Sequence, residues 1–394
     1  MTRKKLLFAS EVFPYPLDRG DRVRISHILE ACARDYDVTF IGPHPLDSLV
    51  PEIPRTIRQV ILFDQNEAIG FKPRLWLAAM RTRIGLPLSR NLFRRCRFLN
   101  ALQKLNFSDF DVIWAERPDV GVFFSDVRER TVVDYDDISH RKLSRLRDIQ
   151  THFLRRLYIQ YQVMVYRAAE LHRFRGYKGI IVCSEDDRSY LAERGVSPVS
   201  VVRNGVLAPA HPATTRSRAN GQALKAVFLG NMSHAPNVDA VHFCVEEILP
   251  LAGGVIESFD VIGANAPPEL ESKFGDQVRF RGFVNDIAVA LQKYDVMLVP
   301  LRFGSGTKLK LLEAMAANLP VITTDVGAEG LMLETGVSAY IANTPKEIVS
   351  ALKLLSLDRK AAGQIAASAR RLVDQHFTWS SVEDGICEIL NAKR

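Results

Sequence analysis

Short apolar runs alternate with segments of helical periodicity along most of the chain. Several runs are continuously apolar, which is typical of parallel strands covered on both faces. Strands that alternate with helices in this way predict an α/β fold with doubly wound sheets. The predicted strands are residues 6–10, 38–41, 59–63, 112–115, 131–134, 179–183, 199–202, 225–229, 259–262, 278–280, 296–300, 320–324 and 339–341.

The chain has one good candidate for a domain boundary. Residues 204–223 are rich in Pro, Ala, Gly, Thr and Ser and poor in large apolar side chains, as interdomain linkers are. At 394 residues the chain is also too long for one core of ordinary size. We therefore predict a domain over 1–204, a linker over 205–223, a second domain over 224–375 and a C-terminal helix over 376–394.

The composition, 47% hydrophobic and 25% charged, is that of a soluble globular protein. No run of about 18 uncharged apolar residues occurs, so no transmembrane helix is predicted. The first residues begin like a signal peptide, but Glu11 interrupts the apolar stretch, and a buried strand is the better interpretation. The five cysteines are scattered without metal-ligand or redox spacing, which favours reduced thiols in a cytoplasmic protein.

The positive charge is concentrated in the first half of the chain. Residues 1–205 hold 34 Lys and Arg against 25 Asp and Glu, and the remainder holds 18 against 20. Two Arg-rich segments, 81–98 and 140–158, interleave basic and apolar residues. Such segments lie on anionic membranes, face nucleic acid or form helices with solvated basic faces. No nucleic-acid motif is present, so a nucleic-acid partner is not predicted; the other two interpretations stay open.

The strongest chemical signal lies in residues 302–330, which read as a strand end, a glycine loop and a helix. Thr307 is the predicted N-cap of that helix, which we expect to run to about residue 317. A helix N-terminus favours phosphate, and Lys308 and Lys310 add charge for a diphosphate. Glu313 lies among apolar neighbours, where a carboxylate is costly unless it binds something, such as a ribose diol. A plain strand-loop-helix with solvated lysines is the alternative.

This segment, "GTKLKLLEAMAANLPVITTDVGAEGL", resembles the donor-binding motif of retaining GT-B glycosyltransferases of the family 4 type. That family has two glutamates separated by seven residues, the second in the "LLEAMA" helix. Glu313 matches the second, whereas Ser305 stands at the position of the first. The resemblance implies the GT-B fold: two Rossmann-like doubly wound domains facing a central cleft, with the C-terminal helix packed back toward the N-terminal domain.

The resemblance also assigns the donor and acceptor sides. The second domain is expected to bind the nucleotide, with Phe283 at the base unless it is a core residue. The donor-binding residues implied are Gly230, Asn231, Gly282, Phe283, Gly304, Ser305, Gly306, Thr307, Lys308, Lys310 and Glu313. The segment "FPYPLDRGDRVRIS" is similar to the family's acceptor-side loop, which implies Gly20, Asp21 and Arg24 there.

A cluster of polar residues follows the predicted strand 131–134. Carboxylates and a histidine at a strand's carboxyl end sit where ligands of α/β folds bind, and one of them could orient or deprotonate an acceptor hydroxyl. The candidate catalytic residues are Asp137 and His140, together with Lys308 on the donor side. In the alternative interpretation, Asp137 or Ser139 caps the next helix and His140 is exposed.

The resemblance implies transfer of a sugar, with retention, from a nucleotide diphosphate sugar to a hydroxyl of a polysaccharide, lipid-linked glycan or glycoside. No metal and no cofactor beyond the nucleotide sugar are expected. A sugar-nucleotide epimerase or hydrolase of the same fold, or a non-catalytic nucleotide-sugar-binding protein, stays open. A dinucleotide oxidoreductase is not expected, because G-x-G-x-x-G is absent after the first strand. We expect a cytoplasmic protein, with peripheral association with the inner membrane left open.

Overall fold

The computed structural model describes residues 3–17, 19–45, 54, 56–64, 90–207, 219–275, 277–304 and 306–391. The chain divides into two compact units, which are described separately. Unit 1 comprises Met1–Arg203 and Val382–Arg394, and unit 2 comprises Asn204–Ser381. Residues 208–218 of the predicted linker lie outside the described residues.

Unit 1 contains, in its described part, a seven-stranded parallel sheet in the order β3-β2-β1-β4-β5-β6-β7. Its strands are β1 (Lys4–Ala9), β2 (Tyr36–Pro43), β3 (Gln59–Phe63), β4 (Val112–Glu116), β5 (Thr131–Asp134), β6 (Gly179–Val182) and β7 (Val199–Val201). Its helices are α1 (Gly20–Asp35), α3 (Arg90–Leu102), η1 (Phe107–Asp109), α4 (Pro118–Gly121), η2 (Val122–Arg130), α5 (Ser139–Asp148), α6 (Phe153–Ala168), η3 (Ala169–Arg173) and α7 (Glu185–Ala192). The strand order reverses between β1 and β4, as in Rossmann folds.

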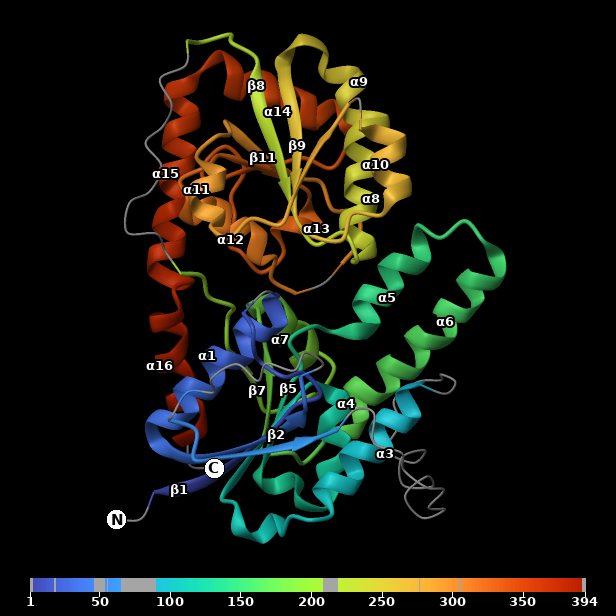
Figure 1. Ribbon diagram of the computed structural model, residues 1–394, viewed down its shortest axis with the longest axis vertical. Helices are drawn as coiled ribbons and strands as arrows, with labels where there is room; N and C mark the ends of the chain where they lie inside the picture. Colours follow the sequence, from blue (N-terminus) through green and yellow to red (C-terminus); the bar gives the residue numbers. More distant parts are fainter. Residues whose placement is uncertain are drawn as a thin grey trace. The chain divides into compact units, whose positions relative to one another are not determined.

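Unit 2 repeats this plan with a six-stranded parallel sheet in the order β10-β9-β8-β11-β12-β13, again within the described residues. Its strands are β8 (Leu224–Leu229), β9 (Ile256–Ile262), β10 (Arg279–Gly282), β11 (Val296–Val299), β12 (Val321–Thr323) and β13 (Tyr340–Ile341). Its helices are α8 (Ala235–Phe243), η4 (Cys244–Ile248), α9 (Leu249–Ala252), η5 (Gly253–Val255), α10 (Pro268–Phe274), α11 (Ile287–Leu291), α12 (Leu309–Ala316), α13 (Asp325–Ala328), α14 (Pro345–Leu357) and α15 (Arg359–His376). In Figure 1, α15 runs along one side of these strands and α8 with α10 along the other.

The predicted fold class is confirmed, because both units are parallel sheets of Rossmann order with helices between the strands. Each predicted strand is present, and 59–63 and 131–134 have the predicted bounds. The largest difference is β9, which begins three residues before the predicted 259. Its first three residues include Glu257 and Ser258, so they lack the continuous apolar character from which strands were predicted.

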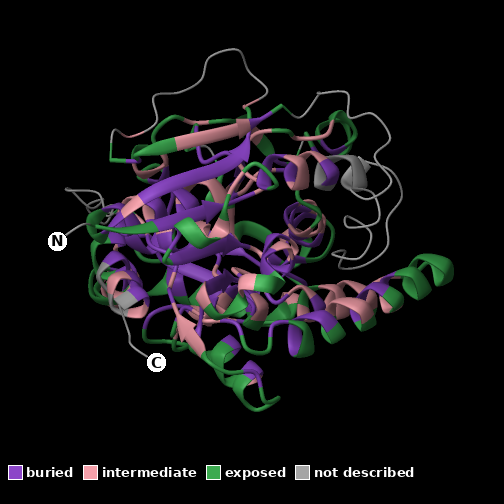
Figure 2. Cartoon of the chain, turned by 90° about the horizontal axis from the view of Figure 1, so that it is seen from below, coloured by how far each residue is buried: buried purple, intermediate pink, exposed green. Residues whose placement is uncertain are grey.

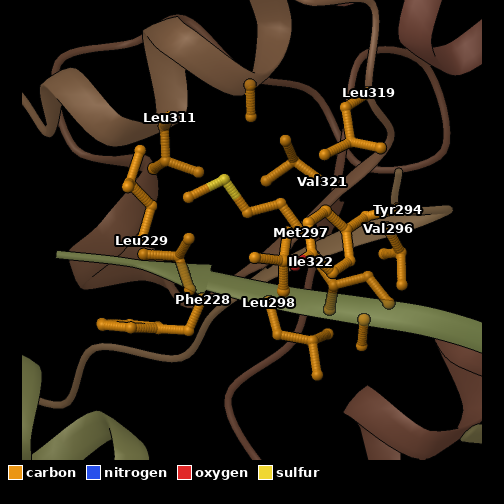
Figure 3. Close-up of a cluster of buried hydrophobic side chains, with 14 of the residues drawn as sticks. Phe228, Leu229, Tyr294, Val296, Met297, Leu298, Leu311, Leu319, Val321 and Ile322 are labelled. Carbon is orange, nitrogen blue, oxygen red and sulfur yellow. The ribbon is translucent and has the colours of Figure 1, made fainter. Parts of the chain in front are cut away.

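The core of unit 2 holds α12 against the sheet. Leu311 and Leu312 on this helix are fully buried with strand residues of β8, β11 and β12. Figure 3 shows Leu311 on the same side of β8 as the side chains of Leu229 and Met297. Because α12 is fixed by these apolar contacts, its polar residues are held at a constant position on the sheet edge.

The last helix, α16 (Trp379–Asn391), begins in unit 2 and ends in unit 1. Within unit 1, Glu383 pairs with His27 at 3.1 Å and with Arg34. The hydroxyl of Tyr36 donates a 3.2 Å hydrogen bond to the backbone carbonyl of Leu390. Among the described residues, none of the helices combines the length and apolar character needed to cross a membrane.

Candidate functional site

The carboxyl ends of β8 and β11 lie side by side where the strand order of unit 2 reverses. Ligands of open α/β sheets bind at this type of position. The loop after β8 carries Gly230 and Asn231, and the loop after β11 leads through Gly304 and Gly306 into α12. The fold therefore brings two of the predicted donor-binding segments to one edge of the sheet.

Lys310 reaches from the first turn of α12 across this edge. Its Nζ donates a 2.5 Å hydrogen bond to Oδ1 of Asn237 and lies 4.4 Å from the ring centroid of Phe228. A Cβ added at Gly230 would lie 2.7 Å from that Nζ, which is closer than side-chain contacts allow. Glycine at 230 is thus what lets the ammonium approach the end of β8. Asn237 was not among the predicted residues.

The Lys310 ammonium and the Glu313 carboxyl have strongly perturbed pKa values. Burial lowers the pKa of Lys310 to about 7, with Glu313 raising it and Lys308 lowering it further. Burial also raises the pKa of Glu313 to about 7, against the opposing charge of Lys310. A cation and a carboxyl one turn apart, both costly to keep charged when buried, are suited to bind a ligand with anionic and hydroxyl groups.

The start of α12 differs from the prediction. The helix begins at Leu309, so Thr307 is not its N-cap; Lys308 occupies that position without a capping hydrogen bond from its side chain. The φ angles of Gly304 (142°) and Gly306 (68°) hold the loop in conformations that favour glycine, which delays the first helical turn. Oγ1 of Thr307 is buried and has no hydrogen-bond partner among the described residues.

Lys308 is a buried side chain beside this loop. Its Nζ donates a 2.5 Å hydrogen bond to the carbonyl of Gly306 and lies 3.9 Å from a carboxylate oxygen of Glu329. The lysine therefore holds the glycine loop against the segment that follows β12. Ser305, also predicted for the donor site, lies outside the described residues.

The remaining donor-side predictions fall on neighbouring loops of unit 2. Gly282 ends β10 with a φ of 67°, and Phe283 after it is 64% exposed, so the alternative of a core position for Phe283 is wrong. Asn231 accepts hydrogen bonds from the backbone and hydroxyl of Ser233 and from Nδ2 of Asn265. Asn231 thus shapes the loop after β8.

In unit 1, the structure corrects the placement of Arg24. The guanidinium is only 3% exposed and forms a bidentate ion pair with Asp134, with N–O distances of 2.9–3.2 Å. It also donates to the carbonyl of Val202. Arg24 therefore ties α1 to the ends of β5 and β7. Gly20 and Asp21, predicted at a loop tip, form the first turn of α1.

His140 is also buried, which contradicts the alternative of an exposed side chain. Its Nδ1 lies 2.5 Å from Oε2 of Glu170, and its Nε2 lies 2.7 Å from the hydroxyl of Tyr190. Glu170 further accepts from the backbone N–H groups of Ser139 and His140, so it is held as an acceptor and His140 donates through Nδ1. The other ring nitrogen, Nε2, is directed at the Tyr190 hydroxyl.

Asp137 is partly exposed. Its carboxylate is 3.3 Å from Nζ of Lys142, on the first turns of α5. The predicted role as a cap of this helix is not seen, because Ile138 holds the cap position and no side chain caps it.

Sequence reasoning missed Glu116 and Arg117 at the end of β4. Glu116 is buried, accepts from the hydroxyl of Ser10 at 3.2 Å and pairs with Arg117 at 2.9 Å. Burial raises the pKa of Glu116 to about 7, although Arg117 opposes the shift. Arg117 has a φ of 74°, a rare conformation for a residue with a side chain. A glutamate directly after the buried run 112–115 was the available signal.

Both units are Rossmann-like, and each has titratable residues at the carboxyl ends of its strands. In unit 2 these are Lys310 and Glu313, and in unit 1 they are buried carboxylates such as Glu116. Residues 223–358 match the model of the family "Glycosyl transferases group 1".

A curated relative with a similar sequence is also a glycosyltransferase. A phosphatidyl-myo-inositol mannosyltransferase from Mycobacterium leprae is 30% identical over 155 residues, which cover 36% of this chain and 41% of that protein. The match thus spans less than half the length of this relative.

Solved structures cover nearly the whole chain. Sucrose-phosphate synthase from Thermosynechococcus elongatus superposes with a TM-score of 0.73 at 16% identity, covering 98% of both chains. Anabaena HepE in complex with UDP and glucose superposes with a TM-score of 0.65 at 15% identity, covering 99% of this chain and 100% of its own. At these identities the likeness shows the fold, which is that of GT-B glycosyltransferases.

Proposed function

We propose that this chain is a retaining glycosyltransferase of the family 4 type. It transfers a sugar from a nucleotide diphosphate sugar to a hydroxyl group of a polysaccharide, a lipid-linked glycan or a glycoside. The observation that carries the proposal is the Lys310–Glu313 pair at the reversal point of the unit 2 sheet. This pair lies inside the segment that matches the glycosyl transferases group 1 model.

On the donor side, Lys310 binds the diphosphate and Glu313 accepts hydrogen bonds from the ribose hydroxyls. The glycines at 230, 304 and 306 let the ligand approach the backbone. Phe283, exposed at the end of β10, contacts the nucleotide base. As the sugar leaves, the lysines stabilise the negative charge that develops on the departing nucleotide diphosphate. The nucleotide sugar is the sole co-substrate in this proposal, with no metal or other cofactor.

On the acceptor side, the proposal assigns the carboxyl ends of β4 and β5 in unit 1. Asp137 and His140 are the candidates for orienting or deprotonating the acceptor hydroxyl, and Glu116 joins them because its pKa of about 7 suits proton transfer near neutrality. For His140 to act directly, the acceptor hydroxyl takes the place of the Tyr190 hydroxyl at Nε2. We place the protein in the cytoplasm, with peripheral association with the inner membrane face.

A non-catalytic nucleotide-sugar-binding protein is the second candidate. It is favoured by Ser305, which stands where the resemblance implies the first glutamate of the motif. In that case the donor half would be kept while turnover is lost.

A thermal-shift screen against UDP, GDP, ADP and their sugar conjugates tests the donor site. A ligand at a hundredfold excess over its dissociation constant stabilises the folded state by about 2.7 kcal/mol, which is readily detected. We expect a selective shift with one nucleotide, reduced in Glu313→Ala and Lys310→Ala. Wild-type shifts in both variants would refute the site.

The nucleotide sugar selected in this way is then incubated with the protein, with and without glycan acceptors. Slow donor hydrolysis or transfer with retained configuration supports the enzyme, and an inverted product refutes the retaining assignment. Binding without any turnover supports the second candidate instead.

A further inference from the structure

Helix α6 in unit 1 has apolar side chains on two opposite sides. Ile159 and Val163 are buried on one side of the helix. A second stripe remains exposed, and Phe153 and Leu154 within it are 71% and 78% accessible. Its members are Phe153, Leu154, Leu157, Tyr158, Tyr161 and Met164. With about 100° of rotation per residue, these positions share one face, opposite the buried side.

Basic residues flank this stripe. Helices α5 and α6 and the turn between them, residues 139–168, contain seven Lys and Arg and a single Asp. Arg155, Arg156 and Arg167 are exposed on α6 on either side of the apolar face. This segment therefore carries a net charge of +6, close to the +7 of the whole chain.

The two helices form a hairpin whose side chains are largely accessible at its far end. Residues 151–158 are all exposed, and this end is coloured as exposed in Figure 2. The helices pack mainly on each other, and α5 buries only His140. An apolar face of this size on a surface helix marks a site of interaction.

We propose that this exposed face of α6 docks the protein onto an anionic lipid membrane. Phe153, Leu154 and Leu157 enter the boundary between headgroups and acyl chains, while the flanking arginines pair with lipid phosphates. Tyr158 and Tyr161 present the amphipathic rings that membrane interfaces favour. A second copy of the chain is a poorer occupant, because it would bring two surfaces of charge +6 together.

This proposal rests on the membrane association given in the proposed function and identifies the surface responsible for it. Membrane binding by this surface does not depend on transferase activity. Binding is measured by co-sedimentation of the full chain with two kinds of vesicles. One contains phosphatidylcholine alone, and the other also contains about one third phosphatidylglycerol, whose negative charge attracts basic residues. We expect strong binding to the anionic vesicles, weak binding to the neutral ones and a marked decrease in high salt.

Two double variants separate the contributions. Phe153→Glu with Leu154→Glu removes apolar contacts, and Arg155→Glu with Arg156→Glu reverses two charges; each is expected to lower partitioning about tenfold or more. The matched control is Leu354→Glu with Leu357→Glu, which changes exposed leucines of α14 in unit 2 and leaves vesicle binding unchanged. The nucleotide-induced thermal shift is read on all variants, so that a loss of folding or of the donor site is recognised separately.

Three results would overturn the proposal. The first is wild-type protein that does not bind anionic vesicles at low salt. The second is vesicle binding that survives both double variants. The third is a dimer in solution that the Phe153→Glu, Leu154→Glu variant dissociates, which would make this face a contact between copies of the chain.

Discussion

Donor affinity is expected to pass through a maximum near pH 7. Burial brings the pKa of Lys310 down to about 7 and that of Glu313 up to about 7. Binding needs a charged Lys310 for the diphosphate and an ionised Glu313 for the ribose. Affinity is therefore lost as pH rises and Lys310 is deprotonated, and it is lost as pH falls and Glu313 is protonated. Because the two groups interact, the acidic and alkaline limbs of this pH profile report the titration of the pair and not of either residue alone.

The size of the effect follows from these pKa values. At a pH of about 8.5, the charged fraction of a group with a pKa of 7 is ~16-fold lower than at pH 7, which corresponds to ~1.6 kcal/mol of binding free energy. The same loss applies to the ionised fraction of Glu313 at a pH of about 5.5. The diphosphate of a nucleotide sugar is a diester that keeps its charge across this window, so the limbs belong to the protein.

Isothermal titration calorimetry across this range, with the nucleotide sugar chosen by thermal shift, measures both limbs. Lys310→Met lowers affinity at pH 7 and removes the alkaline limb, because no ammonium is left to titrate. Glu313→Gln removes the acidic limb in the same way. A wild-type profile flat to within about threefold would refute the reasoning, as would an alkaline limb that persists in Lys310→Met.

Three further results are expected. Arg24→Met leaves Asp134 buried without its partner and should lower the free energy of unfolding by about 3–5 kcal/mol in urea titrations. The control Arg58→Met removes an exposed ion pair with Asp37 and should lower it by under about 1 kcal/mol. Equal losses of stability would contradict the buried pairing. Gly230→Ala crowds Lys310 and should weaken nucleotide binding, while Gly254→Ala, in open space, should not; equal affinities would argue against the site. Tyr190→Phe should preserve transfer while His140→Ala lowers turnover about a hundredfold; equal losses would show that Tyr190 is itself required.

The sequence predicted the sheets well because buried parallel strands are marked by local composition. The strand β5 begins at Thr131 and ends at Asp134, as predicted, since its apolar run is bounded by polar residues. The helix α12 was also predicted, because its apolar residues recur at helical spacing. Its first residue was not, because the backbone angles of the glycine loop decide where the helical turn begins, and glycine accepts many such angles.

The contacts of the acceptor-side residues could not be predicted in the same way. Arg24 meets its partner Asp134 across 110 residues of sequence, and His140 meets Glu170 across 30. Such pairings depend on the tertiary fold, which brings residues of distant elements together. Glu116 was missed for the same reason, because its pKa depends on burial that only the folded unit creates.

The division of the chain has a consequence for the order in which the units fold during synthesis. Unit 2 is continuous, Asn204–Ser381, whereas unit 1 needs both its first 203 residues and the final segment from Val382 onward. Glu383 and Leu390, which bind α1 and the start of β2, are translated only after the whole of unit 2. At about 5–20 residues per second, the nascent first part of unit 1 waits roughly 10–40 s for these contacts. The unit that begins first is therefore completed last, and a fragment that stops at Arg203 lacks part of its own core.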